Sequence, residues 1–305
     1  SRYNAPIIGS LAEGENPSIA IESSPGIISS ASILNGNLEL DWQMRGRSSA
    51  QGRIDGQSLL LADVDGGDAY ELIVGGKSED GAAEIIATRD GSPIWSKIFG
   101  GFQGDLPNWN ENGLIIWHAG KFRDQDKEDI VVTLRRSSYN SDESHLVDGQ
   151  SGGHLWRREA FFRDWVDNGA GRGAGGDWSI VIDQDSNGID DIVMFANDGV
   201  AVLNGETGES VEEKPSEEFF GSQEFIRQAI PFHDVDGIEQ IVIFDASEGI
   251  RMLDRVLEVV WDSGDGGAQY STAVIADLDG DGIDELVVVG DDYSSSIVAY
   301  NGNGS

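Results

Sequence analysis

The sequence predicts an all-β protein, a β-propeller of about six four-stranded blades. Three features support this prediction: an acidic loop that recurs along the chain, an apolar strand after each copy, and an Asn-Gly or Asp-Gly pair further on. They keep one order and recur roughly every 40 to 60 residues, the spacing of propeller blades. Each repeat is therefore predicted to run as strand A, acidic loop, strand B, strand C, turn and strand D.

The clearest acidic loop covers residues 277–285, Asp-Leu-Asp-Gly-Asp-Gly-Ile-Asp-Glu. Alternate side chains on a curling loop converge on one point, and Ca²⁺ accepts about six to eight oxygen ligands. The loop runs directly into an apolar strand, as its other copies do. The predicted ligands are the side chains of Asp277, Asp279, Asp281 and Glu285 and the backbone carbonyl of Ile283.

Two more copies keep several carboxylates. For the loop 183–191, the predicted ligands are Asp183, Asp185, Asn187 and Asp191, with the carbonyl of Ile189. The loop 63–71 has glycine at its fifth position, and Asp63, Asp65 and Glu71 could hold an ion with extra water. Oxygen donors without His or Cys favour Ca²⁺ over softer metals, and Mg²⁺ demands stricter octahedral geometry. The sequence thus predicts structural Ca²⁺ at two loops, with 63–71 as a third candidate.

The remaining three copies begin at residues 10, 121 and 234, and no metal is expected in them. Lys121 and Arg123 stand at the first and third positions of their loop, where a positive charge repels Ca²⁺. Either side chain could instead pair with Asp129 and mimic the ion. The loop from 234 is two residues shorter and ends on Gln240, and the first loop has Ser and Ala where ligands should stand.

The D strands share a tryptophan. Trp42, Trp95, Trp156 and Trp261 follow the acidic loops at similar spacing, and Val211 fills this place in the fourth repeat. Before these strands, Asp-Gly at 90–91 and 148–149 and Asn-Gly at 204–205 predict tight turns, because type I′ turns need positive φ. The sixth repeat lacks strand D, and a seventh blade in a longer precursor stays open. Within one domain, 1–305, the approximate blades are 1–50, 51–105, 106–166, 167–220, 221–263 and 264–305.

These repeats resemble the FG-GAP, or integrin α-type, β-propeller repeat. The acidic loops, the apolar B strands and the ends "GSPIW", "SGGHLW" and "TGESV" carry the resemblance over nearly the whole chain. It implies a calcium-binding propeller at the cell surface or outside the cell. It does not fix the function, because this repeat serves adhesion receptors, lectins and polysaccharide lyases alike.

The charge and composition exclude several classes of function. The net charge of −35 disfavours binding to nucleic acid and to anionic membranes. It fits a high-salt or calcium-rich setting, where screening shortens self-repulsion. The absence of cysteine excludes disulfides and zinc thiolate sites. No apolar run approaches the roughly 18 residues that insertion into a membrane needs. The start, Ser1-Arg-Tyr-Asn, lacks Met and a signal segment, which indicates a processed or trimmed chain.

No catalytic residue is predicted. The 4 histidines lack partners at a recognisable catalytic spacing, and no G-x-S-x-G, H-E-x-x-H or P-loop motif occurs. With 55 acidic residues, a pair of carboxylates carries no information. The sequence therefore predicts a protein that is not an enzyme.

Binding to a partner is expected on the connectors between strand D and the next strand A, because loops carry function on a rigid scaffold. These connectors are rich in aromatic residues and arginine, which contact sugar rings, carboxylates and protein partners. Six of the 8 tryptophans fall in predicted strands, Trp117 and Trp178 among them. The predicted contact residues are Trp109, Trp165, Arg163, Arg172 and Phe102. The alternative is that they plug the central channel or clamp neighbouring blades.

The leading hypothesis is a non-enzymatic, Ca²⁺-stabilised extracellular propeller for adhesion or for recognition of a protein or glycan. One alternative is a secreted enzyme that acts on polysaccharides, or the propeller part of one. Another is a structural subunit of a surface assembly, in which a neighbour completes the open last blade, because exposed strand edges invite pairing.

Overall fold

The structure is a computed structural model of residues 1–305. All regular elements among the described residues are β-strands, which confirms the all-β prediction. No helix in the described part of the chain has the length and apolarity that crossing a membrane requires. The structure describes residues 7–9, 18–24, 27–34, 37–45, 59–67, 69–77, 83–99, 114–123, 126–134, 143–159, 178–196, 199–215, 226–233, 239–245, 249–263, 270–276, 278, 285–290 and 297–300.

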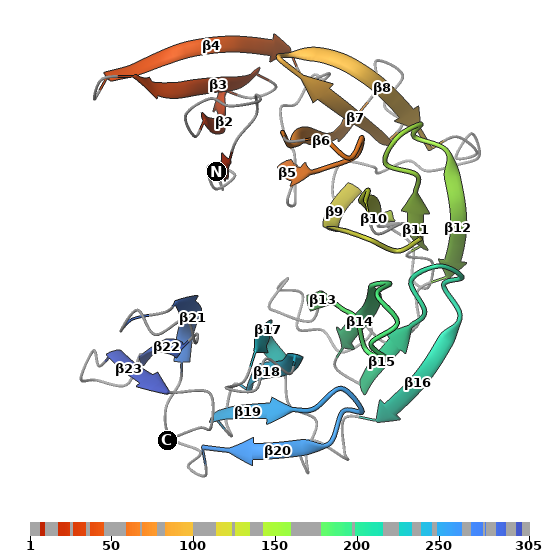
Figure 1. The fold of residues 1–305 in the computed structure, drawn as a ribbon, viewed down its shortest axis with the longest axis vertical. Helices are drawn as coiled ribbons and strands as arrows, with labels where there is room; N and C mark the ends of the chain where they lie inside the picture. The colour runs from red at the N-terminus through yellow and green to blue at the C-terminus, as the bar shows by residue number, and fades with distance from the viewer. Residues whose placement is uncertain are drawn as a thin grey trace, which may run out of the picture. The chain divides into compact units, whose positions relative to one another are not determined.

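The chain forms two compact units, and the first covers Ser1–Arg163. It contains three antiparallel sheets of four strands, and neighbouring strands of each sheet follow one another in the chain (Figure 1). The strands are β1 (Ile7–Gly9), β2 (Ser18–Ser24), β3 (Ile27–Leu34), β4 (Asn37–Arg45), β5 (Leu59–Ala62), β6 (Glu71–Lys77), β7 (Ala83–Arg89), β8 (Ser92–Ile98), β9 (Leu114–Gly120), β10 (Asp129–Leu134), β11 (Glu143–Val147) and β12 (His154–Glu159).

The second unit covers Asp164–Ser305 and repeats this plan. Its first two sheets have four strands each, and its third has the three strands β21, β22 and β23. Its strands are β13 (Trp178–Ile182), β14 (Asp191–Ala196), β15 (Gly199–Leu203), β16 (Ser210–Pro215), β17 (Ile226–His233), β18 (Glu239–Asp245), β19 (Gly249–Leu253), β20 (Val259–Asp262), β21 (Tyr270–Ala276), β22 (Glu285–Gly290) and β23 (Ile297–Tyr300).

The apolar cores lie between consecutive sheets of one unit. In the first unit, Ile73 and Ile85 of the second sheet cluster with Ile130 and Val132 of the third. Equivalent clusters join the first sheet to the second, the fourth to the fifth, and the fifth to the sixth. Burial of each such side chain contributes about 1.5–3 kcal/mol. This face-to-face packing of four-stranded meanders is that of propeller blades, and it holds the loops at the sheet ends in fixed positions.

The C–D hairpins contain a bulge that the sequence pattern does not show. In all five four-stranded sheets, the register between strands C and D shifts by one residue near the turn. Trp95 opposes Ala87 in the second sheet, and Glu212 opposes Val202 in the fourth. Glu212 therefore stands in the tryptophan place of the fourth sheet, and the prediction of Val211 is wrong by one residue. The bulge adds one unpaired residue at the same point of each of these sheets, and the cross-strand pairing after it identifies the equivalent residue.

Two of the predicted tight turns are also wrong. At 90–91 both residues have positive φ, 51° and 75°, as a type I′ turn requires. At 148–149 and 204–205 the positive φ instead falls later, on Gly152 and Gly208. The backbone N–H of each of these glycines donates to the carbonyl four residues earlier, at 2.8 Å. The C–D turns of the third and fourth sheets are therefore longer than two residues.

The tryptophans of strand D contact the turn of the next sheet. A Cβ added to Gly152 would lie 2.7 Å from the Trp95 ring, and one added to Gly91 would lie 3.0 Å from the Trp42 ring. Both glycines have positive φ, 69° and 75°. Any larger side chain would therefore meet the ring and strain the backbone. These contacts join consecutive sheets of the first unit near their acidic loops.

Candidate metal centre

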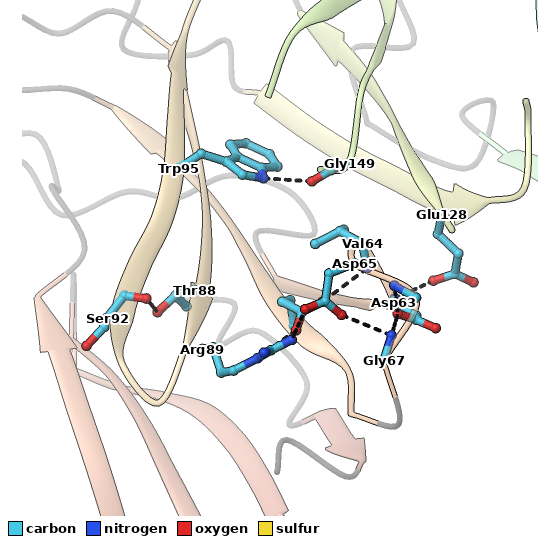
Figure 2. A network of polar contacts seen from close by, with 12 residues as sticks. Asp63, Val64, Asp65, Gly67, Thr88, Arg89, Ser92, Trp95, Glu128 and Gly149 are labelled. Carbon is cyan, nitrogen blue, oxygen red and sulfur yellow. Dashed lines mark hydrogen bonds and ion pairs between the residues drawn. The ribbon is translucent and has the colours of Figure 1, made fainter. Parts of the chain in front are cut away.

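The loop between β5 and β6 gathers three carboxylates. Asp63, Asp65 and Glu71 offer oxygen atoms that all lie within 4.8 Å of one another. The loop curls around its own acids: the N–H groups of Gly66 and Gly67 donate to Asp63 Oδ1 at 2.8 and 3.1 Å. Gly67 also donates to Asp65 Oδ1 at 3.0 Å (Figure 2). The first, third and ninth positions of the loop therefore meet at one point, and this group could hold a metal ion.

Glu71 closes the loop from inside the protein. Its side chain is 0 % exposed, and its Oε2 accepts the N–H of Val64 at 3.1 Å. Burial raises the pKa of Glu71, and hydrogen bonds from Arg89 and from the Val64 N–H offset this only in part. A buried carboxylate needs donors or a nearby cation to stay charged.

Arg89, the last residue of β7, supplies such a cation. Its Nη2 donates to Asp65 Oδ2 at 2.6 Å, and its Nε donates to Glu71 Oε1 at 2.9 Å (Figure 2). These bonds raise the pKa of Arg89, with the bond to Glu71 as the largest cause. Sequence reasoning missed Arg89 because it lies outside the nine-residue loop. Its position at the end of strand C was the available signal.

The loop 121–129 contains an arginine of its own. Arg123 Nε and Nη2 donate to the two oxygens of Asp129 at 2.8 and 2.7 Å, and Nη2 also donates to Asp148 Oδ2 at 2.6 Å. This confirms the expectation that Arg123 pairs with Asp129. The bond to Asp129 is the largest cause of the raised pKa of Arg123. With Lys121 at its first position, the donor set of this loop does not fit a divalent cation.

In the loop 183–191, carboxylates accept hydrogen bonds from backbone N–H groups of the same loop. Asp183 accepts the N–H of Asn187 at 3.0 Å and that of Gly188 at 2.8 Å. Asp185 also accepts the Asn187 N–H, at 3.2 Å, and the side chain of Asn187 accepts the N–H of Ile189 at 2.7 Å. The loop therefore has the same curled form as 63–71, with its polar side chains turned into the curl.

Asp191 closes this loop and is 3 % exposed. Its Oδ1 accepts the N–H of Gly205 at 3.1 Å. Burial raises the pKa of Asp191 to about 6, and repulsion by Asp185 and Asp183 adds to the effect. Among the described residues, the 63–71 group alone meets the 4.8 Å distance, and the acids of 183–191 do not.

The loop 277–285 is described at its two ends. Glu285 begins β22, and its Oε2 accepts the N–H of Leu278 at 2.7 Å. The same contact joins the ninth and second positions of 63–71, so the two loops share one closing geometry. The other predicted ligands, Asp277, Asp279, Asp281 and Ile283, lie outside the described residues.

Other predictions fall outside the described residues as well. The loop that begins at residue 10 and the start of the loop from 234 belong to this group, so the expectation of no metal there stays a prediction. The predicted contact residues of the connectors also lie there, and their role stays a prediction. They are Phe102, Trp109, Arg163, Trp165 and Arg172.

Two acidic loops of the first unit are joined by hydrogen bonds between Asp63 and Glu128. The N–H of Asp63 donates to Glu128 Oε2 at 2.7 Å, and the N–H of Glu128 donates to the carbonyl of Asp63 at 2.8 Å. Nearby, Trp95 Nε1 donates to the carbonyl of Gly149 at 2.6 Å (Figure 2). The first ligand position of 63–71 is therefore fixed by the next sheet, not only by its own loop.

Two histidines pair within the third sheet. His154 Nε2 and His145 Nδ1 lie 3.2 Å apart, and the Phe99 ring packs edge-on against His145, with ring centroids 5.3 Å apart. Burial lowers the pKa of His154, and the charges of Lys97 and Arg157 lower it further. Both histidines lie in strands, β11 and β12.

No family model matches the sequence, and no curated protein matches it. Solved structures do match the fold. A rhamnogalacturonan lyase from Bacillus licheniformis is 14 % identical, with a TM-score of 0.60 over 99 % of this chain and 56 % of that chain. BBS1N in complex with ARL6DN is 9 % identical, with a TM-score of 0.64 over 99 % and 80 % of the two chains. Sqt1 from Saccharomyces cerevisiae is 12 % identical, with a TM-score of 0.54 over 94 % and 68 %.

The chain spans 56 % of the length of the lyases that it matches. At these identities the likeness shows the fold alone. It supports the β-propeller class, with six antiparallel sheets of which the last has three strands.

Proposed function

We propose that this protein is a Ca²⁺-stabilised extracellular β-propeller of the FG-GAP type that recognises a protein or a glycan and catalyses no reaction. The observation that carries the calcium part is the convergence of Asp63, Asp65 and Glu71 within 4.8 Å. It supports the prediction that the nine-residue loop directs its first, third and ninth side chains to one point. Carboxylates without His or Cys favour Ca²⁺ there.

The proposed ions sit in the loops 183–191 and 277–285, which keep carboxylates at these positions. In the first of them, Asp183, Asp185, Asn187 and Asp191 would hold the ion, with the carbonyl of Ile189. Bound Ca²⁺ supplies positive charge among acids that otherwise repel one another. Because it binds the folded loop, it stabilises the protein by about 2.7 kcal/mol when free ion is 100 times Kd.

Calorimetric titration with Ca²⁺ tests this directly. The wild-type protein should bind two ions and melt at a higher temperature in Ca²⁺ than in EGTA. Asp191→Asn should remove one ion, while the matched control Asp190→Asn, one residue away and outside the ligand set, should keep both. A wild-type protein that takes up no Ca²⁺ and melts equally in both buffers would exclude the calcium part.

The recognition part rests on the connectors, which concentrate aromatic residues and arginine in a chain with 55 acidic and 20 basic residues. Aromatic faces stack on sugar rings and anchor protein partners. A glycan array and an extracellular-protein array, probed with the wild type and with Trp109→Ala and Trp165→Ala, test it. Loss of a hit in either variant, with an unchanged melting temperature, supports recognition by the connectors. Hits that survive both changes place the contact elsewhere.

A polysaccharide-acting enzyme is the second candidate, because the matched lyases cover 99 % of this chain. Release of unsaturated products from rhamnogalacturonan or another acidic polysaccharide, followed by ultraviolet absorbance, tests it. Product formation would replace the non-enzymatic proposal. Its absence across such substrates, with binding retained, would support recognition alone.

A further inference from the structure

We propose that Arg89 is a built-in cation. Its guanidinium takes the part of a divalent ion in the 63–71 loop, and this loop becomes a Ca²⁺ site when asparagine replaces Arg89. The inference deepens the calcium proposal above and rests on it, since it names which loop closes without an ion. It is based on the hydrogen bonds that Arg89 donates to Asp65 and Glu71.

The strand register places Arg89 at a defined point of the repeat. The first apolar residue of strand B opposes Thr88 in the second sheet, Val147 in the third and Leu203 in the fourth. The next residue along the chain is therefore equivalent in the three sheets. That residue is Arg89, Asp148 and Asn204, respectively.

The second and third sheets use this point with opposite charges. In the third sheet, Arg123 of the acidic loop binds Asp148 of the turn at 2.6 Å. In the second, Asp65 of the acidic loop binds Arg89, the last residue of strand C, also at 2.6 Å. In both sheets the arginine also binds the carboxylate that closes the loop. Each cluster thus has one guanidinium between two carboxylates, and only the element that carries it changes.

Removal of the arginine should have different results in the two loops. Without Arg89, the 63–71 loop keeps three acids whose oxygens already lie within 4.8 Å of one another. Each of the three acids also accepts a backbone N–H group of the loop, independently of Arg89. Without Arg123, the other loop keeps Lys121 at its first position and Asp129 at its last. The first loop then suits a hard divalent cation, and the second does not.

The fourth sheet shows that asparagine is compatible with this point of the repeat. Asn204 Oδ1 accepts the N–H of Thr207 at 3.0 Å, within its own turn. No positive charge then enters the 183–191 loop from this position. Arg89→Asn therefore gives the second sheet the same residue that the fourth sheet has at the equivalent position.

The experiment compares Ca²⁺ binding by calorimetry and melting temperature for the wild type, Arg89→Asn, Arg89→Lys and Arg123→Asn. Arg89→Asn should bind one more ion than the wild type, while Arg89→Lys and Arg123→Asn should bind the same number as the wild type. In EGTA, Arg89→Asn and Arg123→Asn should both melt lower than the wild type. Saturating Ca²⁺ should bring the melting temperature of Arg89→Asn back to that of the wild type. It should not do so for Arg123→Asn.

An Arg89→Asn protein that gains no ion, or that stays unfolded or destabilised at saturating Ca²⁺, would overturn the inference. An extra ion in Arg89→Lys would also overturn it, because positive charge would then not be what excludes the metal. The wild type reports separately on the calcium proposal. If it binds no ion while Arg89→Asn binds one, the proposal for 183–191 and 277–285 fails and the inference on Arg89 stands. If the wild type and Arg89→Asn each bind two ions, the calcium proposal stands and the inference on Arg89 fails.

Discussion

The acidic loops of the two units differ in the source of their positive charge. In the first unit, the loops 63–71 and 121–129 each hold an arginine against the carboxylate that closes the loop. In the second unit, Arg255 reaches the loop 183–191 at the hydroxyl of Ser186 rather than at a carboxylate. The acidic loops of this chain therefore share a curled form, but they differ in whether an arginine binds their carboxylates.

Two carboxylates at these loops show what the difference does. Burial raises the pKa of both. For Asp148, hydrogen bonds from Arg123 and Ser151 outweigh burial, and the pKa is lowered. For Asp191, repulsion by Asp185 adds to burial, and the pKa rises to about 6. Arg123 thus favours the ionised form of Asp148, whereas Asp191 has a neighbouring acid in place of a cation and Glu71 keeps a raised pKa despite Arg89.

Removal of Ca²⁺ is expected to have the largest effect and to act on the second unit. Strands β13 and β14, which flank 183–191, should lose up to about 2.7 kcal/mol of protection against amide exchange, the amount that saturation at 100 times Kd provides. Strands β5 to β12 should keep their protection, because arginine side chains bind the carboxylates of their acidic loops. Hydrogen-exchange mass spectrometry in Ca²⁺ and in EGTA measures both units in one sample. An equal loss in both would erase the distinction between them.

Loss of the internal cation should weaken the first unit whether or not calcium is present. Arg123→Ala leaves Asp129, 4 % exposed, without its bidentate partner. The expected cost is about 2 kcal/mol, below that of a fully buried pair because Arg123 is itself partly exposed. Urea unfolding in Ca²⁺ and in EGTA measures it.

Arg251→Ala is the matched control for that change. It breaks a bond of 3.1 Å to Asp262, whose side chain is 40 % exposed, and should cost about 1 kcal/mol, less than loss of the bidentate pair. If Arg123→Ala costs no more than this control, the arginine in the loop is an ordinary surface contact.

Asp191→Asn should have a smaller effect, and its sign should depend on calcium. Because the pKa of Asp191 is raised to about 6 in the folded protein, its charge opposes folding at neutral pH. The neutral amide should therefore stabilise the protein in EGTA by about 1 kcal/mol and remove the gain from Ca²⁺ at this loop. Thermal melts in both buffers, with Asp190→Asn alongside, measure this. Destabilisation in EGTA would mean that the hydrogen bond to Gly205 matters more than the charge.

The repeat pattern alone was enough to predict the described sheets and the convergence of Asp63, Asp65 and Glu71. Trp117 and Trp178 lie in strands β9 and β13, as expected for A strands. Glu285 begins β22 directly after its acidic loop, as the pattern indicated. These predictions hold because a hydrophobic strand next to an Asp- and Gly-rich turn satisfies local and tertiary preferences together.

The contacts that cross between hairpins could not be predicted in this way. Arg89 reaches Glu71 across 18 positions of the chain, so no motif that is counted within the loop includes it. The pairing of Val202 with Glu212, rather than with Val211, is likewise a cross-strand contact that the pattern does not contain. The side chains that follow Thr88, Val147 and Leu203 share one register, yet they bind the acidic loop in two sheets and their own turn in the fourth.

Acidification should have the smallest effect and should act on the first unit through His154. Its pKa lies below the ordinary value of 6.5, because burial and the charges of Lys97 and Arg157 disfavour the imidazolium. The unfolded chain therefore binds this proton at higher pH than the folded one does. The contribution to stability is complete above 6.5, falls as the pH drops below that value, and levels off below the folded pKa. His154→Gln should remove this step from a plot of melting temperature against pH, and Lys97→Met should make it smaller. A step that persists in His154→Gln would assign the acid sensitivity to another group.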